Sequence, residues 1–374
     1  MKLLVHILSF PFQNYIGRRI LLMIPTLFGI MLINFIVIQS APGGPVEQAI
    51  AELSGANTGA LSNVGGGTGA NAVGANAAAH SGYEFSRGID PALIKELEKQ
   101  FGFDKPAHVR FFTMMWNYIR FDFGESFFQD VPVVTLVMDR MPVSISLGLW
   151  TLLIVYSVSI PLGVRKAVYD GTPFDVWTSM VVLIGYAIPA FILAMLLIIV
   201  LCGGEFLDLF PFRGLTSDGF SEFSSWEKVK DYFWHITLPV VAMVAGSFAT
   251  LTMLTKNSFL DEINKQYVLT AKAKGLTPKR VLYGHVFRNA MLIVIAGFPR
   301  ALLGVLFTGV LLIEVIFSLN GLGLLGFEAI LTRDYPIVFG TLFVFSLLGL
   351  AMQLVTDITY TLIDPRIDFE GREV

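Results

Sequence analysis

The length, composition and charge of this chain exclude most soluble proteins. Its 374 residues are 54% hydrophobic and only 15% charged, whereas a soluble domain carries about 25% charged residues. The net charge of -3 lacks the basic excess of a nucleic-acid binder. A single cysteine excludes an internal disulfide, and five scattered histidines suggest no metal cluster. The mean hydropathy of +0.68 therefore indicates a polytopic membrane protein.

Six apolar runs are long enough to cross a membrane as helices, which need about 20 apolar residues for about 30 Å of hydrocarbon. The predicted spans are 20–39, 143–164, 176–201, 233–254, 290–313 and 336–363. The first run is longer than the apolar part of a signal peptide, so we favour an uncleaved span. The predicted fold class is all-α, with six transmembrane helices.

Lys and Arg in the loops predict the orientation. With the N-terminus inside, the cytoplasmic segments hold 14 of these residues and the two short opposite loops hold 4. Basic residues favour the cytoplasmic side, although the rule weakens in a long loop. We expect both termini in the cytoplasm, with a cytoplasmic segment over 1–19, an extracytoplasmic loop over 40–142 and the core over 143–374. Proline and glycine inside five spans indicate either kinks or hinges.

The extracytoplasmic loop has two parts. Residues 51–82 are mostly Gly, Ala, Asn and Ser, which bury too little apolar surface to offset ordering entropy. This segment predicts a flexible insertion, and a binding role is disfavoured. A helix over 91–100 is expected to begin at Asp90-Pro91. A second, aromatic stretch over 106–121 is expected to pack at the membrane surface or on neighbouring loops rather than to bind peptide.

The loop over 255–289, between the fourth and fifth spans, is basic and contains helix boundary signals. Gly275 is placed to end one short helix in the left-handed conformation. Thr277 followed by Pro278 is placed to begin another. The small side chains of Ala271 and Ala273 suggest a slim surface that fits a groove on a partner. An ordinary solvated loop is the alternative, and the pattern alone favours neither.

Several motifs resemble one family. The string Thr270-Ala-Lys-Ala-Lys-Gly275, followed by His285-Val-Phe-Arg-Asn-Ala290, is similar to the EAA loop of binding-protein-dependent ABC importer permeases of the dipeptide/oligopeptide class. Other matching segments are Ala41-Pro-Gly-Gly-Pro45, Asp122-Phe-Gly124 with Ser126, Arg333-Asp-Tyr-Pro336 and Asp364-Pro-Arg-Ile367. The long first loop and the ending Asp368-Phe-Glu-Gly-Arg372 resemble the branch linked to peptides and to the peptide-nucleotide antibiotic microcin C.

The chain departs from this family pattern at two places. Leu269-Thr270-Ala271 stand where the EAA motif has its glutamate, as is common in the peptide class. Asn320 replaces the proline that many relatives carry before Gly-Leu-Gly. The shape of that turn is therefore not implied by the resemblance.

The resemblance implies a type I ABC importer permease in the bacterial inner membrane. The implied partners are a second homologous permease, two ABC ATPase subunits or one fused tandem ATPase, an extracytoplasmic substrate-binding protein, membrane lipid and a peptide substrate. The implied ATPase contacts are Gln266, Tyr267, Thr270, Ala271, Ala273, Gly275, Leu276 and Arg280.

No catalytic residue, cofactor or metal is expected on this chain. A Walker A motif needs Lys followed by Ser or Thr, and no Lys here precedes either residue. ATP and Mg²⁺ are therefore expected on the ATPase. The string from Gly321 to Gly326 satisfies G-x-G-x-x-G, but a membrane span precedes it instead of a strand. We interpret it as a tight re-entrant or surface turn and not as a nucleotide site.

Polar residues within spans are candidates for the translocation path. Arg300 costs about 2.5–3.5 kcal/mol in a span on insertion scales, so we expect it to line the path or to pair structurally. Asn34 and Gln39 are further path candidates. Asp357, near the end of the sixth span, is expected to anchor that helix at the interface.

Two other functions are disfavoured. An ion-coupled secondary transporter places acids near the bilayer midplane, whereas Asp357 lies close to a span end. An intramembrane protease needs a Ser/His or paired-Asp arrangement, and the spans show none.

Overall fold

The computed structural model describes residues 10–40, 46, 95, 99, 103–202, 207–307 and 311–363, without the side chains of 10–15, 300, 305–307 and 360–363. Regular structure in these ranges is helical, apart from two isolated bridges, Glu125 with Pro132 and Cys202 with Asp208. The all-α prediction is confirmed there. The insertion predicted over 51–82 lies outside the described residues, as does the helix over 91–100 except at Lys95 and Lys99.

The described helices vary from single turns to 39 residues. They are α2 (Phe10–Ser40), α5 (Ala107–Ile119), α6 (Val133–Val168), α7 (Pro173–Ala187), α8 (Ala190–Leu201), a 3-10 turn (Phe220–Glu222), α9 (Ser225–Ile263), α10 (Gln266–Ala273), α11 (Pro278–Val281), a π-helical turn (Leu282–Val286), α12 (Phe287–Phe307), α13 (Leu311–Ile316), α14 (Leu322–Thr332) and α15 (Tyr335–Ile363).

Five described helices are long and apolar enough to cross a membrane. Their ranges are Ile16–Ser40, Val133–Val168, Ser225–Ile263, Pro278–Gly304 and Tyr335–Thr359. They overlap the predicted first, second, fourth, fifth and sixth spans. The described residues thus hold five spans, or six if the bent pair α7 and α8 forms one span.

The third span predicted over 176–201 is sharply bent in the structure, at one of the prolines that indicated a kink or a hinge. The axes of α7 and α8 differ by 91° at the break between them. Ile188 has extended backbone angles, with φ −87° and ψ 117°. Pro189 accounts for this, because its ring disfavours the helical conformation of the preceding residue and it has no N–H for the ladder.

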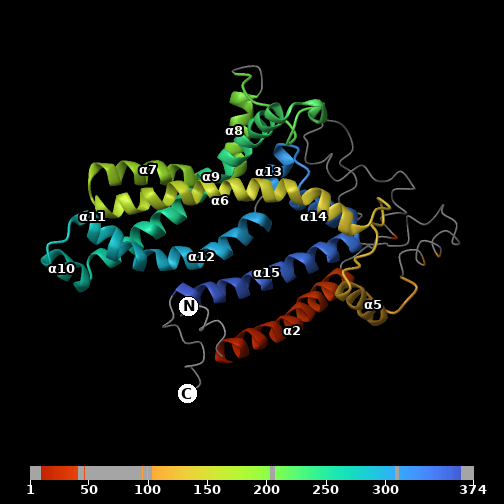
Figure 1. The fold of residues 1–374 in the computed structure, drawn as a ribbon. Helices are drawn as coiled ribbons and strands as arrows, with labels where there is room; N and C mark the ends of the chain where they lie inside the picture. Colours follow the sequence, from red (N-terminus) through yellow and green to blue (C-terminus); the bar gives the residue numbers. More distant parts are fainter. Residues whose placement is uncertain are drawn as a thin grey trace. The chain divides into compact units, whose positions relative to one another are not determined.

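The chain divides into two units, and the larger contains Met1–Arg19, Arg140–Leu324 and Leu348–Val374. Within it, α9 packs against α7, α8 and α12 (Figure 1). Glycine permits close approach of helices. A Cβ atom on Gly163 of α6 would lie 2.8 Å from the carbonyl oxygen of Thr252 in α9, and one on Gly185 of α7 would lie 3.2 Å from that of Ala245.

The smaller unit contains Ile20–Asp139 and Leu325–Leu347. An aromatic cluster fills its interior, with rings in edge-to-face and tilted contacts. Its buried members are Phe35, Phe111, Tyr118, Phe123, Phe339 and Phe343. Burial raises the pKa of the Tyr118 hydroxyl well above its usual range. The aromatic stretch predicted over 106–121 thus forms α5 and packs on neighbouring segments of this unit.

Glu314 is a fully buried acid that sequence analysis missed. Its carboxylate accepts hydrogen bonds from the Ser144 hydroxyl at 3.0 Å and the Leu324 N–H at 2.7 Å. It therefore sits at the N-terminal end of α14, where unpaired N–H groups favour negative charge. Burial nevertheless raises the pKa of Glu314 above its usual value.

The carboxylate of Glu314 also explains part of the G-x-G-x-x-G string. A Cβ atom on Gly321 would lie 2.1 Å from its Oε1 atom. Helix α13 precedes the string and α14 begins within it, so the strand that a dinucleotide site requires is missing there. The predicted turn is a helix start that packs on a buried acid.

We expect Gly321→Ala to destabilise the protein by about 1–3 kcal/mol, because the added methyl group overpacks the Glu314 site. Gly326→Ala is the matched control, since nothing lies within 4 Å of its Cβ position. Thermal unfolding of the purified chain in mild detergent measures both variants. Equal melting temperatures for the two would contradict this packing.

Candidate functional site

The segment between α9 and α12 is more helical than predicted. Helix α9 continues to Ile263, nine residues beyond the predicted end of the fourth span at 254. Helix α10 follows almost at once, from Gln266 to Ala273. Residues 264–283, which we call the α10 segment, therefore follow directly on a long helix rather than forming a free loop.

Gly275 ends α10 as predicted. Its φ of +81° is left-handed, a conformation that costs other residues about 1–2 kcal/mol. The Gly275 N–H donates to the Lys272 carbonyl at 2.9 Å, and the Leu276 N–H donates to the Ala271 carbonyl at 3.4 Å. These two bonds are those of a Schellman motif, which satisfies the last carbonyls of a helix.

The next helix begins where the sequence predicts. Thr277 is extended and Pro278 occupies the first helical position, although the Thr277 side chain caps no backbone N–H. Helix α11 then enters the π-helical turn that leads into α12. Val281 and Val286 are both buried there, so the chain returns from the α10 segment through packed residues.

One face of α10 packs inward. Val268 and Ala271 are buried in the same cluster as Val281, Val286 and Phe259. The prediction that Ala271 belongs to an exposed slim surface is therefore wrong, because only 7% of this residue is exposed. Its small side chain lets α10 lie close to the core of its own chain.

Two large apolar side chains of the α10 segment are exposed, and sequence analysis selected neither of them. Leu269 is 60% exposed and Tyr283, in the π-helical turn, is 62% exposed. Residue type alone does not distinguish an exposed Leu or Tyr in this segment from a Leu or Tyr of the core. The predicted contact residues that are exposed are Gln266, Thr270, Ala273, Gly275 and Arg280. Tyr267 and Leu276 are half-buried, and the Tyr267 hydroxyl donates to Glu262 at 2.7 Å.

A buried ion network joins three helices of the larger unit. The Lys166 ammonium of α6 is fully buried and lies 2.9 Å from Oδ1 of Asp175 in α7. The Lys256 ammonium of α9 lies 2.7 Å from Oδ2 of Asp175 and 2.7 Å from Asp170. Each buried charge thus has an opposite charge beside it, as burial requires.

Lys256 belongs to the stretch over 255–289 that the sequence predicts as a loop. Its side chain lies in α9 and is held between two carboxylates. The basic surface of the α10 segment consists instead of exposed residues. These are Lys265, Lys272, Lys274, Lys279 and Arg280.

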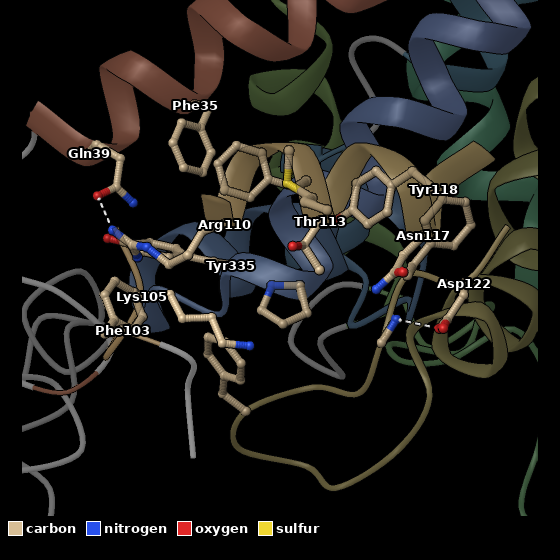
Figure 2. Close-up of a pocket in the computed structure, with 16 residues that line it drawn as sticks. Phe35, Gln39, Phe103, Lys105, Arg110, Thr113, Asn117, Tyr118, Asp122 and Tyr335 are labelled. Atoms are coloured by element: carbon tan, nitrogen blue, oxygen red, sulfur yellow. Dashed lines mark hydrogen bonds between the residues drawn. The ribbon is translucent and has the colours of Figure 1, made fainter. Parts of the chain in front are cut away.

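Two of the three candidate path residues, Asn34 and Gln39, form hydrogen bonds in the structure. Asn34 donates to the Ile30 carbonyl of its own helix at 2.8 Å. Gln39 accepts a hydrogen bond of 2.8 Å from the Arg110 guanidinium (Figure 2). Arg300 lies in α12, but its side chain is outside the described part. The Asp357 carboxylate forms an ion pair of 2.8 Å with Arg19.

No metal centre is evident in the described ranges. There, no three His, Cys, Asp or Glu side chains lie close enough together to hold a metal ion.

Comparison with known proteins gives a consistent result. Residues 159–369 match the family described as "Binding-protein-dependent transport system inner membrane component". The chain is 60% identical to the "Peptidoglycan transport system permease protein YejB" of Agrobacterium fabrum, over 96% of this chain and 99% of that protein. It is 59% identical to the "Inner membrane ABC transporter permease protein YejB" of Escherichia coli O157:H7, over 96% and 99%. It is 29% identical to the "Dipeptide transport system permease protein DppB" of Escherichia coli K12, over 95% and 98%.

We expect Lys256→Met to destabilise the protein by about 1–3 kcal/mol, because it takes a charged hydrogen-bond donor from Asp175 and leaves the network with two carboxylates and one ammonium. Lys265→Met is the matched control. The Lys265 side chain is 55% exposed, and exposed ion pairs are worth less than about 1 kcal/mol. Thermal unfolding of both variants in detergent tests this difference. A Lys256→Met variant as stable as the control would show that the network is dispensable.

Proposed function

The chain belongs to the family of binding-protein-dependent transport system inner membrane components, and we propose that it forms the peptide-conducting permease of an ATP-driven importer. As a member of that family it is a transport subunit of the inner membrane without catalytic activity. ATP use lies with a partner ATPase, and a binding protein is the second partner that the family implies.

Peptides are the substrate class we propose. The observation that carries this proposal is identity of about 60%, over nearly the whole length, to two YejB permeases. One of these is named for peptidoglycan transport, and the more distant DppB is named for dipeptide transport. Short peptide chains are common to both names, because peptidoglycan carries peptide stems. Peptide-nucleotides such as microcin C fall within the same proposed class.

The architecture we propose is that of a type I importer permease with six spans and both termini in the cytoplasm. The bent pair α7 and α8 then counts as one span. The excess of Lys and Arg in the segments assigned to the cytoplasm supports this orientation. Exposed apolar side chains on α7, such as Trp177 and Val181, suit contact with lipid or with a second, homologous permease.

The α10 segment is the ATPase contact that we propose. The segment exposes Leu269, Tyr283 and several basic residues, whereas Val268 and Ala271 of α10 pack on the core. A helix fixed on one side and exposed on the other transmits a push to the helices behind it. Closure of two ATPase subunits, or of one fused tandem ATPase, would move α10 and with it α9 and α12.

Co-purification from the native membrane in mild detergent tests the assignment. We expect a second permease and the ATPase chains to accompany this protein, and a peptide-loaded binding protein to raise ATPase activity. Recovery of the chain alone, without ATPase activity in the preparation, would count against the proposal. Ion-coupled transport, the alternative, would then gain support from the buried acid Glu314.

We expect the pair of changes Leu269→Asp and Tyr283→Ala to weaken ATPase association at least tenfold, because they remove the exposed apolar contacts of the α10 segment. Trp226→Ala is the matched control. This residue is 67% exposed, similar to Tyr283, but lies at the other end of α9. The measurement is the amount of ATPase retained by equal amounts of inserted permease. Equal retention by all variants would contradict the docking role.

A further inference from the structure

A cavity of about 290 Å³ lies within the smaller unit. It is lined by residues of α2, α5, the start of α15 and the turn after α5. Its volume is at the lower end of those of small-molecule sites. Nothing in the transport mechanism proposed above uses this cavity. Its charged residues are distributed unevenly along its length.

One end of the cavity is cationic. Arg110 and Lys105 both line it, and the Arg110 guanidinium lies 4.3 Å from the centre of the Phe103 ring. One of its five N–H donors is directed to Gln39 (Figure 2). Among the described residues, no carboxylate pairs with Arg110, and its Nε atom is buried without a hydrogen-bond acceptor.

A buried N–H donor without an acceptor is costly, because it has lost its hydrogen bonds to water and has gained none within the protein. Burial accordingly lowers the pKa of Arg110 from its usual value. A bound carboxylate or phosphate would offset this cost by forming a bidentate, charge-assisted hydrogen-bonded pair with the guanidinium. The cationic end is therefore built to receive an anionic group.

The other end carries the acid Asp122. Figure 2 shows Asp122 and Asn117 on the side of the cavity away from Arg110 and Gln39, with Thr113 between. One carboxylate oxygen of Asp122 accepts the Gly124 N–H at 3.1 Å. The other has no hydrogen-bond partner in the described part of the chain. This end is suited to an ammonium group.

Helix geometry sets the separation between the two ends. Arg110, Thr113 and Asn117 follow one face of α5, and seven residues advance an α-helix by about 10 Å. Three extended residues of a peptide span about the same length. A zwitterionic lipid headgroup is much shorter, because only two carbon atoms separate its phosphate from its amine. Inorganic phosphate has no cationic group for Asp122.

We propose that this cavity is a binding site for short peptides of about three residues, held by their two charged ends. The C-terminal carboxylate lies against Arg110 and Lys105, and the N-terminal ammonium lies against Asp122. The aromatic walls, including Phe103 and Tyr335, contact the side chains and favour apolar peptides. The inference rests on the proposed function, since it adds a peptide site to a peptide permease.

A single reporter thiol tests the site directly. Cys202 is the only cysteine of the chain, so Thr113→Cys in a Cys202→Ser background places one thiol in the cavity. Thr113 is exposed in the structure and accessible to maleimide. The rate of alkylation is measured in the full transporter complex, in nanodiscs, with and without trialanine. We expect saturating trialanine to slow alkylation at least tenfold.

Changes in the ligand and in the protein identify the contacts. Trialanine amide lacks the carboxylate and N-acetyl-trialanine lacks the ammonium, so neither should protect the thiol. Arg110→Gln should abolish protection by trialanine, and Asp122→Asn should weaken it. Arg120→Gln is the matched control. It removes a cation that stacks on Trp116 and does not line the cavity, so protection should persist.

Equal protection by trialanine and its amide would overturn the proposal even if Arg110→Gln did not fold. The proposal would also be overturned if trialanine gave no protection but inorganic phosphate did. The same holds if nanodiscs of phosphatidylethanolamine protected the thiol, relative to nanodiscs of phosphatidylcholine, while trialanine did not. Uptake of labelled peptide by the same complex, without alkylation, distinguishes a failure of the cavity site from a failure of the proposed function. Uptake without thiol protection would refute the cavity site alone, whereas absence of any peptide uptake would refute the proposed function and the inference together.

Discussion

The pairing of Lys166, Lys256, Asp170 and Asp175 is the constraint on which the larger unit depends. A charge buried at the end of membrane helices is tolerated only beside its counter-charge. The Lys166 ammonium also donates to the Asp175 carbonyl and to the hydroxyls of Thr178 and Ser179. Its position thereby fixes the first two turns of α7 against α6. Lys256 extends the same restraint to α9, the helix that carries the α10 segment.

This restraint gives the α10 segment a rigid base. Val268 and Ala271 pack into the core, and the Schellman motif at Gly275 turns the chain back toward α12. Close packing resists compression, so a force on the exposed face passes to α9 and α12 instead of deforming a loop. This geometry suits the ATPase contact that we propose for the α10 segment, since the chain itself supplies no energy for transport.

Local patterns in the sequence predicted much of this architecture. Runs of apolar residues located the spans, and Gly275 and Thr277-Pro278 located the turn after α10, because both signals act over a few residues. Proline and glycine indicated a kink or a hinge in the third span but not a break of 91°, because proline does not always interrupt a membrane helix. Pro161 and Pro239 lie inside the continuous helices α6 and α9.

Contacts between distant residues were beyond the reach of local patterns. Glu314 bonds to Ser144, 170 residues away, and Lys256 pairs with Asp175, 81 residues away. A glutamate or a lysine in the sequence does not reveal which distant residue it pairs with. The burial of Ala271 likewise depends on where α10 packs. The cationic end of the cavity depends on the contact between α2 and α5, where Gln39 accepts a hydrogen bond from Arg110.

If this chain conducts peptides with energy supplied by other subunits, peptide uptake must depend on ATP. Uptake of labelled trialanine into proteoliposomes that contain the assembled transporter and its binding protein tests it most directly. We expect uptake that requires ATP and persists when an ionophore collapses the proton gradient. Accumulation of peptide by this chain alone, driven by a proton gradient without ATP, would contradict it.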